Sequence, residues 1–494
     1  YFNLDAIVRT AWRMLVMHRR LLEWSPSDEQ DHHNRTGLVA FCRTMWIGPA
    51  VAAATVIVLA LSRPAALELA QLILALWFVS PVFAWWISRP LARRAARLTA
   101  TQTIFLQKLS RKTWAYFETF VGPEDHWLPP DNYQEHPAAV IAHRTSPTNM
   151  GLALLANLSA YDFGYIPAGQ LIERTANAFD TMEALERHRG HFYNWYDTLS
   201  LKPLLPMYIS TVDSGNLAGH LLTLRQGLLA LPDNKIVGTR LFDGLNDTMR
   251  ILVDAAGETA PAELARLQQD LASGSRPMTL AAARQQLERL TASAAILLDA
   301  FDADSSESQA KWWALALVRQ CRCAFDELTY LAPWILLPAS PETIKEIGGI
   351  EEIPTLRELA RLAAELPPAI EASAGAREDH GGIRHLIAEA SRRAGARIAA
   401  IEHLALRTGE FANIEYDFLF DKASHLLAIG YNVSEHRRDS SYYDLLASEA
   451  RLCCFVAIAQ GLLPQESWFA LGRLLTAAGG QPVLLSWSGS MFEY

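Results

Sequence analysis

Apolar residues recur at i, i+3, i+4 and i+7 through most of the chain after about residue 100, which is the spacing of amphipathic helices. Strand-like runs are few and short, and a turn at 421–425 joins the first two of them as a hairpin. The pattern therefore predicts an all-α fold, and the succession of long helices predicts a toroid. The expected helices are 151–160, 168–189, 218–231, 241–256, 280–301, 308–331, 356–365, 383–401 and 441–460, and the expected strands are 416–421, 426–433 and 482–488.

Two stretches near the N-terminus, 44–62 and 69–88, contain no charged residue. At about 1.5 Å per residue each helix would be roughly 28–30 Å long, which matches the hydrocarbon thickness of a bilayer. Residues 63–68 separate the stretches, so the sequence predicts a tight transmembrane hairpin. A buried hairpin in a soluble protein is the alternative.

Arginines flank this hairpin on both sides, whereas its connecting loop has one Arg and one Glu. The positive-inside rule then places both flanks in the cytoplasm. The predicted division is a cytoplasmic N-terminal helical segment at 1–43, the two-helix hairpin at 44–88 and a soluble helical domain at 89–494. The flanking arginines are Arg19, Arg20, Arg35 and Arg43 before the hairpin and Arg89, Arg93, Arg94 and Arg97 after it.

Composition and charge limit the kinds of partner that the chain is expected to bind. The net charge is −9, and no basic block interleaved with aromatic residues is present, so we expect no nucleic-acid partner. The five cysteines show no C-x-x-C spacing, and the histidines show no H-E-x-x-H motif. We therefore predict no metal site.

Several loops between the expected helices share a mixture of acids, amides, prolines and aromatic rings. Sugars bind through such groups, because carboxylates and amides pair with hydroxyls while Trp and Tyr rings pack on C–H faces. Caps and turns are the alternative explanation for any single loop. The recurrence of the same polar and aromatic mixture in several loops favours a carbohydrate groove. The segments are "GPEDHWLPPDNYQE", "HRTSPTNMG", "GHFYNWYDTLSLKPL", "STVDSGNLAGHLL" and "SWSGSMFEY".

One carboxylate stands out in "SSYYDLLASEARLCCF". Glu449 falls in the apolar stripe of the predicted helix 441–460, which Ser441 and Asp444 would cap. A carboxylate facing a core must be paired with a positive charge, protonated, or used in catalysis or binding. Catalysis, sugar binding and structural pairing with Arg451 or Arg473 therefore remain open, and catalysis is favoured.

The motifs "RKTWAYFETFVGPEDHWLPPDNYQEHP", "AHRTSPTNMGLALLA", "RHRGHFYNWYDTLSLKPL", "STVDSGNLAGHL" and "SSYYDLLASEARL" closely resemble the central region of bacterial cyclic β-1,2-glucan synthases. The resemblance runs over nearly the whole chain. It implies a multi-pass protein of the bacterial inner membrane, with membrane lipid around the hairpin. It also implies an upstream glucosyltransferase domain using UDP-glucose and a downstream phosphorylase-like domain on the same polypeptide, so the chain is expected to be a fragment.

The family's central region is a glycoamylase-like (α/α)6 barrel, which the resemblance implies here for residues 89–494. Its implied reaction cyclises linear β-1,2-glucan by intramolecular transglycosylation with retention, without a cofactor. Retention uses two carboxyls roughly 5–5.5 Å apart. An endo-β-1,2-glucan hydrolase and a non-catalytic glycan-binding scaffold are the alternatives.

On this resemblance Glu449 is the expected acid/base, and Glu493 in "SMFEY" is the alternative. Another Glu motif follows Tyr494 in family members, and it is the expected source of the nucleophile. The fragment alone is then expected to bind glucan poorly without turning it over. The expected substrate-binding residues are Asp125, Trp127, Asn149, Tyr193, Asn194, Trp195, Asp197, Asp213 and Asn216.

Overall fold

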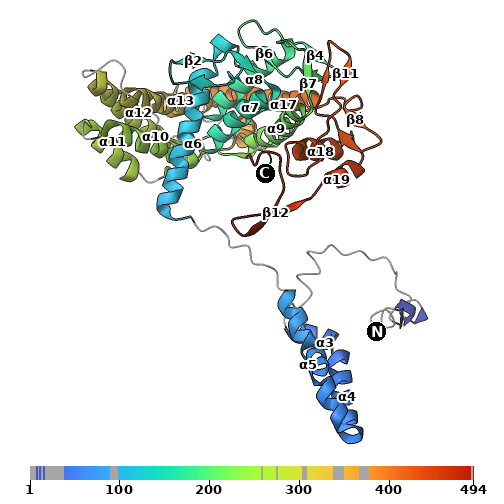
Figure 1. Cartoon of the computed structure of the whole chain (residues 1–494). Coiled ribbons are helices and arrows are strands. Elements are labelled where there is room, and N and C mark those ends of the chain that lie inside the picture. Colours follow the sequence, from blue (N-terminus) through green and yellow to red (C-terminus); the bar gives the residue numbers. More distant parts are fainter. Residues whose placement is uncertain are drawn as a thin grey trace. The chain divides into compact units, whose positions relative to one another are not determined.

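The computed structural model describes residues 7–8, 10–12, 15–16, 38–88, 98–257, 260–273, 276–302, 309–337, 350–365, 378–490 and 493 (Figure 1). The chain forms two compact units, Tyr1–Arg97 and Leu98–Tyr494. Of the arginines that flank the predicted hairpin, Arg43 is described. The other seven lie outside the described residues.

The first unit contains the two predicted apolar helices. Its elements are α3 (Leu38–Thr44), α4 (Ile47–Ser62) and α5 (Pro64–Ile87). The expected connector 63–68 is wrong, because Arg63 alone separates α4 from α5. Pro64 occupies the first turn of α5, where its missing N–H costs no hydrogen bond. Leu61 and Leu69, near the junction, are 84% and 87% exposed.

By length and composition, α5 is able to cross a membrane. Helices α3 and α4 meet the same test only together, and a bend of 64° separates them. Among the described residues the first unit therefore offers one straight candidate span and one bent one.

The second unit is built from paired helices. Helices α7 and α9, α9 and α17, α10 and α13, α12 and α13, and α15 and α17 pack against each other. The predicted class, an all-α fold of helical hairpins with a few short strands, is confirmed in these features. The helices are α6 (Ala100–Phe120), α7 (Pro147–Asp162), α8 (Ala168–Ala184), α9 (Thr211–Ala230), α10 (Arg240–Ala256), α11 (Ala262–Ser273), α12 (Leu280–Asp302), α13 (Gln309–Leu331), α15 (Leu356–Glu365), α17 (Glu378–Phe411), α18 (Ala450–Ala459) and α19 (Glu466–Ala470).

Helix α9 lies at the centre of this packing, in contact with α7, α17 and α18 (Figure 1). Glycines allow the close approach. A Cβ added to Gly215 would lie 2.2 Å from Cβ of Cys453 in α18, and one added to Gly227 would lie 2.6 Å from the Leu158 side chain in α7. Such distances are far below van der Waals contact, so Gly215 requires a residue without a side chain, whereas at Gly227 the Leu158 methyl groups would have to move.

The strands are short and lie at the ends of the helices. Strands β8 and β9 pair as the predicted hairpin, and β7 leads directly into α9. A three-stranded sheet has the order β11-β10-β7. The strands are β1 (Tyr133–Gln134), β2 (Val140–Ile141), β3 (Arg144–Thr145), β4 (Arg187–His188), β5 (His191–Phe192), β6 (Tyr196–Asp197), β7 (Tyr208–Ser210), β8 (Phe420–Asp421), β9 (Leu426–Leu427), β10 (Gly430–Asn432), β11 (Arg437–Arg438), β12 (Leu475–Ala478) and β13 (Gln481–Leu484).

Helix boundaries differ from the predicted ones where polar residues form the first turn. Helix α9 begins at Thr211 rather than at 218, because Ser210 caps it by accepting a hydrogen bond from the Asp213 amide. Helix α8 ends at Ala184, since the chain then turns into β4. Helix α11 lies between the expected helices 241–256 and 280–301, where no helix was predicted.

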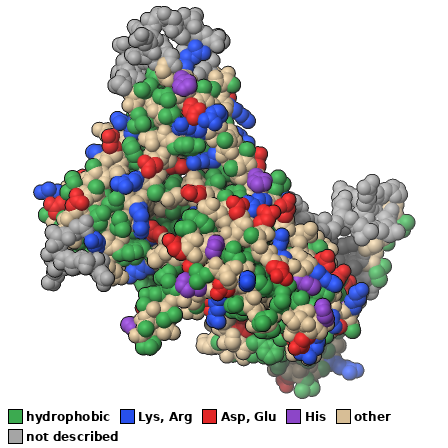
Figure 2. Space-filling view, turned by 90° about the horizontal axis from the view of Figure 1, so that it is seen from above, with side chains coloured by type: hydrophobic (Ala, Val, Ile, Leu, Met, Phe, Trp, Pro, Cys, Tyr) green, Lys and Arg blue, Asp and Glu red, His purple; other side chains and the backbone are tan. Residues whose placement is uncertain are grey.

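Charges of both signs are interspersed with apolar side chains on the face seen in Figure 2. This mixture is typical of a globular surface and offers no extended region of one sign on that face.

Candidate functional site

Three helices of the second unit begin close together, and their first turns carry the candidate residues. Ser146 caps α7 by accepting from the Asn149 amide, and Ser210 caps α9. The Thr148 hydroxyl in α7 donates to Oδ1 of Asp213 in α9 at 2.6 Å. This bond joins the two N-termini side by side.

Glu449 immediately precedes the third helix, α18. Nδ2 of Asn216 donates to Oε2 of Glu449 at 3.3 Å and also to Oγ1 of Thr148 at 3.2 Å. Glu449 is half-buried. A continuous series of hydrogen bonds therefore connects Glu449 to Asp213 through Asn216 and Thr148.

The surroundings of Glu449 raise its pKa above the ordinary carboxyl value. Burial is the largest cause, and the charges of Asp213 and Glu493 act in the same direction, whereas the hydrogen bond from Asn216 lowers the pKa. The protonated acid therefore persists to higher pH than in an exposed glutamate. A general acid requires this property.

The predicted helix 441–460 is wrong in its first half. Residues before Glu449 form isolated bridges instead, pairing Tyr442 with Ala428 and Leu445 with Gly472. Glu449 consequently occupies the N-cap position of α18 rather than the middle of a helical stripe. The suggested structural partner Arg473 donates to the carbonyl oxygens of Leu471 and Trp468.

Asn194 and Trp195 extend the hydrogen-bonded group. With the Asn194 amide oriented to satisfy both neighbours, its nitrogen donates to Oδ2 of Asp213 and its oxygen accepts from Nε1 of Trp195, each at 3.2 Å. The Arg144 guanidinium lies 4.8 Å from the centroid of the Trp195 ring. An indole, an amide and carboxylates therefore lie together, which is the chemistry that the loops predict for a sugar.

Asn149 joins the same region through a residue that the sequence analysis did not select. Its Nδ2 donates to Oδ1 of Asp131 at 3.3 Å, and Arg144 donates to Oδ2 of Asp131 at 3.0 Å. Thr148 and Arg144 were missed as well. A Thr in the first turn of a helix resembles an ordinary cap. Only the hydrogen bonds of Thr148 to Asp213 and Asn216 in α9 show its role. Asp131 lies in the loop "GPEDHWLPPDNYQE", so the acidic and aromatic composition of that loop was the signal that could have identified it.

The remaining expected binding residues have other partners. Asp125 is 5% exposed and accepts from His143 and Thr198. Asp197 accepts from the amides of Leu199 and Ser200 at 3.2 and 2.7 Å, which lowers its pKa. These bonds stabilise the loop.

The two aromatic residues expected to bind sugar also make contacts of their own. Tyr193 is 3% exposed and donates to Glu186 at 3.4 Å. The Arg174 guanidinium lies 5.6 Å from the Trp127 ring centroid. Both side chains therefore contact scaffold residues.

Glu493, the alternative catalytic acid, is 6% exposed and fixes a loop. It accepts from the Ser488 hydroxyl at 2.7 Å and from the backbone amides of Trp487, Ser488 and Ser490. The Ser488 hydroxyl is the leading cause of a pKa of about 2. The side chain is therefore ionised at neutral pH, which does not suit a general acid. Its neighbours Met491, Phe492 and Tyr494 lie outside the described residues.

Within the described ranges, no three His, Cys, Asp or Glu side chains are grouped so that they could hold a metal ion.

Comparison with known proteins found no matching family model. The chain is 34% identical to the cyclic β-(1,2)-glucan synthase NdvB of Rhizobium meliloti (strain 1021), over 515 aligned residues that include 99% of this chain. The resemblance to the cyclic β-1,2-glucan synthases is thereby confirmed. The chain spans 16% of the length of that synthase.

Among solved structures, a candidate glucoamylase from Bacteroides fragilis NCTC 9343 is 20% identical over 27% of this chain and 32% of its own, with a TM-score of 0.23.

Proposed function

We propose that this chain is the glucan-modifying part of a cyclic β-1,2-glucan synthase and cyclises linear β-1,2-glucan by retaining transglycosylation. The observation that carries the proposal is Glu449. It is half-buried, its pKa is raised, and it is hydrogen-bonded into a cluster that holds Trp195, Asn194 and Asp213. The similarity to a protein named as a cyclic β-(1,2)-glucan synthase supports the choice of substrate.

Glu449 acts as the acid/base in this proposal. Its proton passes to the glycosidic oxygen as the C1–O bond breaks, while a second carboxylate forms a bond to C1. The Glu449 carboxylate then takes the proton of a hydroxyl at the non-reducing end of the same glucan, which attacks C1 and releases the second carboxylate. Asp213 and Glu493 are both engaged by hydrogen bonds, so we assign neither as that nucleophile.

The context of the reaction is part of the same proposal. We place α5 and the bent α3–α4 pair across the bacterial inner membrane, with the second unit in the cytoplasm. The similar synthase is much longer than this chain, which supports partner domains on one polypeptide. We expect these to be a glucosyltransferase that supplies linear glucan and a phosphorylase-like domain.

A chimeric synthase tests the proposal. The matching region of the Rhizobium protein is replaced by this chain, and the products are analysed by mass spectrometry, since a cyclic glucan lacks one water relative to its linear equivalent. Cyclic product supports the proposal. Shorter linear product indicates a hydrolase, and glucan binding without turnover indicates a scaffold.

Glu449→Gln in the chimera is expected to reduce turnover by about 10²–10⁴-fold, because a proton-transfer group is lost. Glu435→Gln is the matched control, since Glu435 is an exposed partner of Arg437. Full activity of the Glu449→Gln protein contradicts the assignment.

A further inference from the structure

A cavity of about 360 Å³ lies at the opposite ends of the helices that carry the Glu449 cluster. Tyr161 and Asp162 at the end of α7 line it, as does Leu231, which follows α9. Thr148 and Tyr161 are both in α7, 13 residues and therefore about 20 Å apart along the helix axis. The cavity is thus a separate place in the second unit, and its volume is within the roughly 300–1,000 Å³ of ligand sites.

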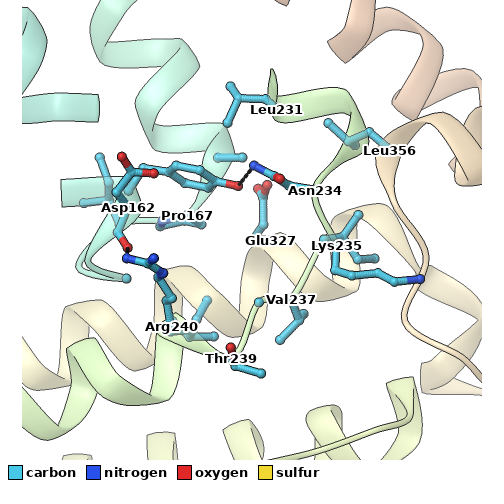
Figure 3. A pocket seen from close by; sticks show the side chains of 18 of the residues that line it. Asp162, Pro167, Leu231, Asn234, Lys235, Val237, Thr239, Arg240, Glu327 and Leu356 are labelled. Carbon is cyan, nitrogen blue, oxygen red and sulfur yellow. Dashed lines mark hydrogen bonds between the residues drawn. The ribbon is translucent and has the colours of Figure 1, made fainter. Parts of the chain in front are cut away.

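Three of the four charged side chains that line the cavity, those of Glu327, Lys235 and Arg240, already have partners within the protein. The Glu327 carboxylate pairs with Arg397 and accepts from the Gly169 amide at 3.1 Å, so it occupies the N-terminus of α8. Lys235 pairs with Glu358 at 3.4 Å, and Arg240 donates to the Asp162 carbonyl at 3.2 Å (Figure 3). A strongly charged ligand would have to displace these partners, so the cavity favours a neutral one.

Groups that pair with hydroxyls and C–H surfaces remain on the cavity wall. Nδ2 of Asn234 donates to the Tyr161 hydroxyl at 3.3 Å, and an amide has two donors and an acceptor, so it has capacity for a further partner. Leu231, Val237 and Leu356 supply apolar surface around them (Figure 3). A neutral ligand with many hydroxyls and C–H faces is a sugar.

We propose that this cavity is a second, non-catalytic glycan site that holds one or two glucosyl units of the glucan on which the Glu449 cluster acts. The inference rests on the proposed function for the identity of the sugar. Such a site would retain a distant part of the chain while the reacting part is bound about 20 Å away, which raises the effective concentration of the glucan at the reaction centre.

Gly238 offers a way to fill the cavity without disturbing the fold. It lines the cavity, and a Cβ added there meets no atom within 4 Å. Gly238→Trp should therefore block the site. Gly395→Trp on α17 is the matched control, because a Cβ at Gly395 also meets open space and Gly395 does not line the cavity.

The test uses the whole chain in detergent, carrying Glu449→Gln to prevent turnover, and titrates it calorimetrically with sophorose, the β-1,2-linked diglucose. We expect two weak binding events, of which Gly238→Trp removes one while Gly395→Trp leaves both. Two events that persist in Gly238→Trp, or a single event in the parent protein, overturn the inference. Competition by inorganic phosphate for the event that Gly238→Trp removes also overturns it, since that result indicates an anion site.

Failure of this inference is distinct from failure of the proposed function. The sophorose titration does not depend on turnover, whereas the chimeric synthase reports cyclisation alone. A single sophorose-binding event in the parent protein, with cyclic product still formed by the chimeric synthase, would reject only the cavity site.

Discussion

The side-chain amide of Asn216 donates to the carboxylate of Glu449 at 3.3 Å, linking the first turn of α9 to the residue that precedes α18. Two effects on the same carboxyl oppose each other here. Burial raises the pKa of Glu449, and the hydrogen bond from Asn216 lowers it. Burial is the larger effect, so the pKa of Glu449 is raised overall.

Asn216→Ala should raise the pKa of Glu449 further, because it removes the donor that stabilises the ionised form. If Glu449 is the acid, the alkaline limb of the pH–rate profile of the chimeric synthase should move to higher pH. Asn246→Ala is the control, since Asn246 donates to the Phe242 carbonyl within α10. An unchanged or downward-shifted limb would contradict this reading of the Asn216–Glu449 bond.

Trp195→Ala should weaken the binding of linear β-1,2-glucan about 3- to 10-fold, corresponding to roughly 0.5–1.5 kcal/mol for one aromatic contact. Trp195 donates a hydrogen bond to the Asn194 side chain, and the Arg144 guanidinium lies over the Trp195 ring. Trp312→Ala in α13, which removes an aromatic contact with Trp313, should leave affinity unchanged. Equal affinities of all three proteins by calorimetry would remove Trp195 from the binding site.

Glu493→Gln should destabilise the loop at Trp487–Ser490 in a pH-dependent manner. The folded pKa of Glu493 is about 2, below the ordinary carboxyl value, so its stabilising effect is fully present above that ordinary value. The effect is lost as pH falls toward 2. Amide hydrogen exchange at Ser488 and Ser490 should therefore accelerate in the variant at pH 6, with the difference shrinking in acid. A difference that grows in acid would reverse the sign of this linkage.

Gly215→Ala should destabilise the second unit by about 1–3 kcal/mol, because the added methyl overlaps Cys453 and forces α18 away from α9. Glu449 precedes α18, so its bond to Asn216 should lengthen and activity should fall with stability. Adding Cys453→Gly should restore neither, because the added methyl would also lie 2.6 Å from the Cα of residue 453. Gly395→Ala, which meets no neighbour, should not destabilise. Denaturant-induced unfolding of the four proteins measures their free energies of unfolding.

Local signals predicted the parts of the fold that depend on local interactions. The bounds of α15 match the expected 356–365, because helical periodicity acts within a few residues. The segment before Glu449 was misread as helix since its Leu and Ala content is helical. Its conformation is set by bridges to Ala428 and Gly472, which no local pattern reveals.

The candidate site divides in the same way. Glu449 could be selected because a carboxylate within an apolar stripe is conspicuous in a sequence, and Asp213 and Asn216 because they lie in the motifs that carry the resemblance. Thr148 and Asp131 could not, since their importance comes from which oxygen or amide lies opposite them across two helices or loops.

Helix α9 extends from the Glu449 cluster at its first turn to the cavity at Leu231, and neighbouring helices pack closely against its glycines. Gly215 near its start lies against Cys453 of α18, and Gly227 near its end lies against Leu158 of α7. The distance between the Glu449 cluster and the cavity is therefore set by the length of one closely packed helix.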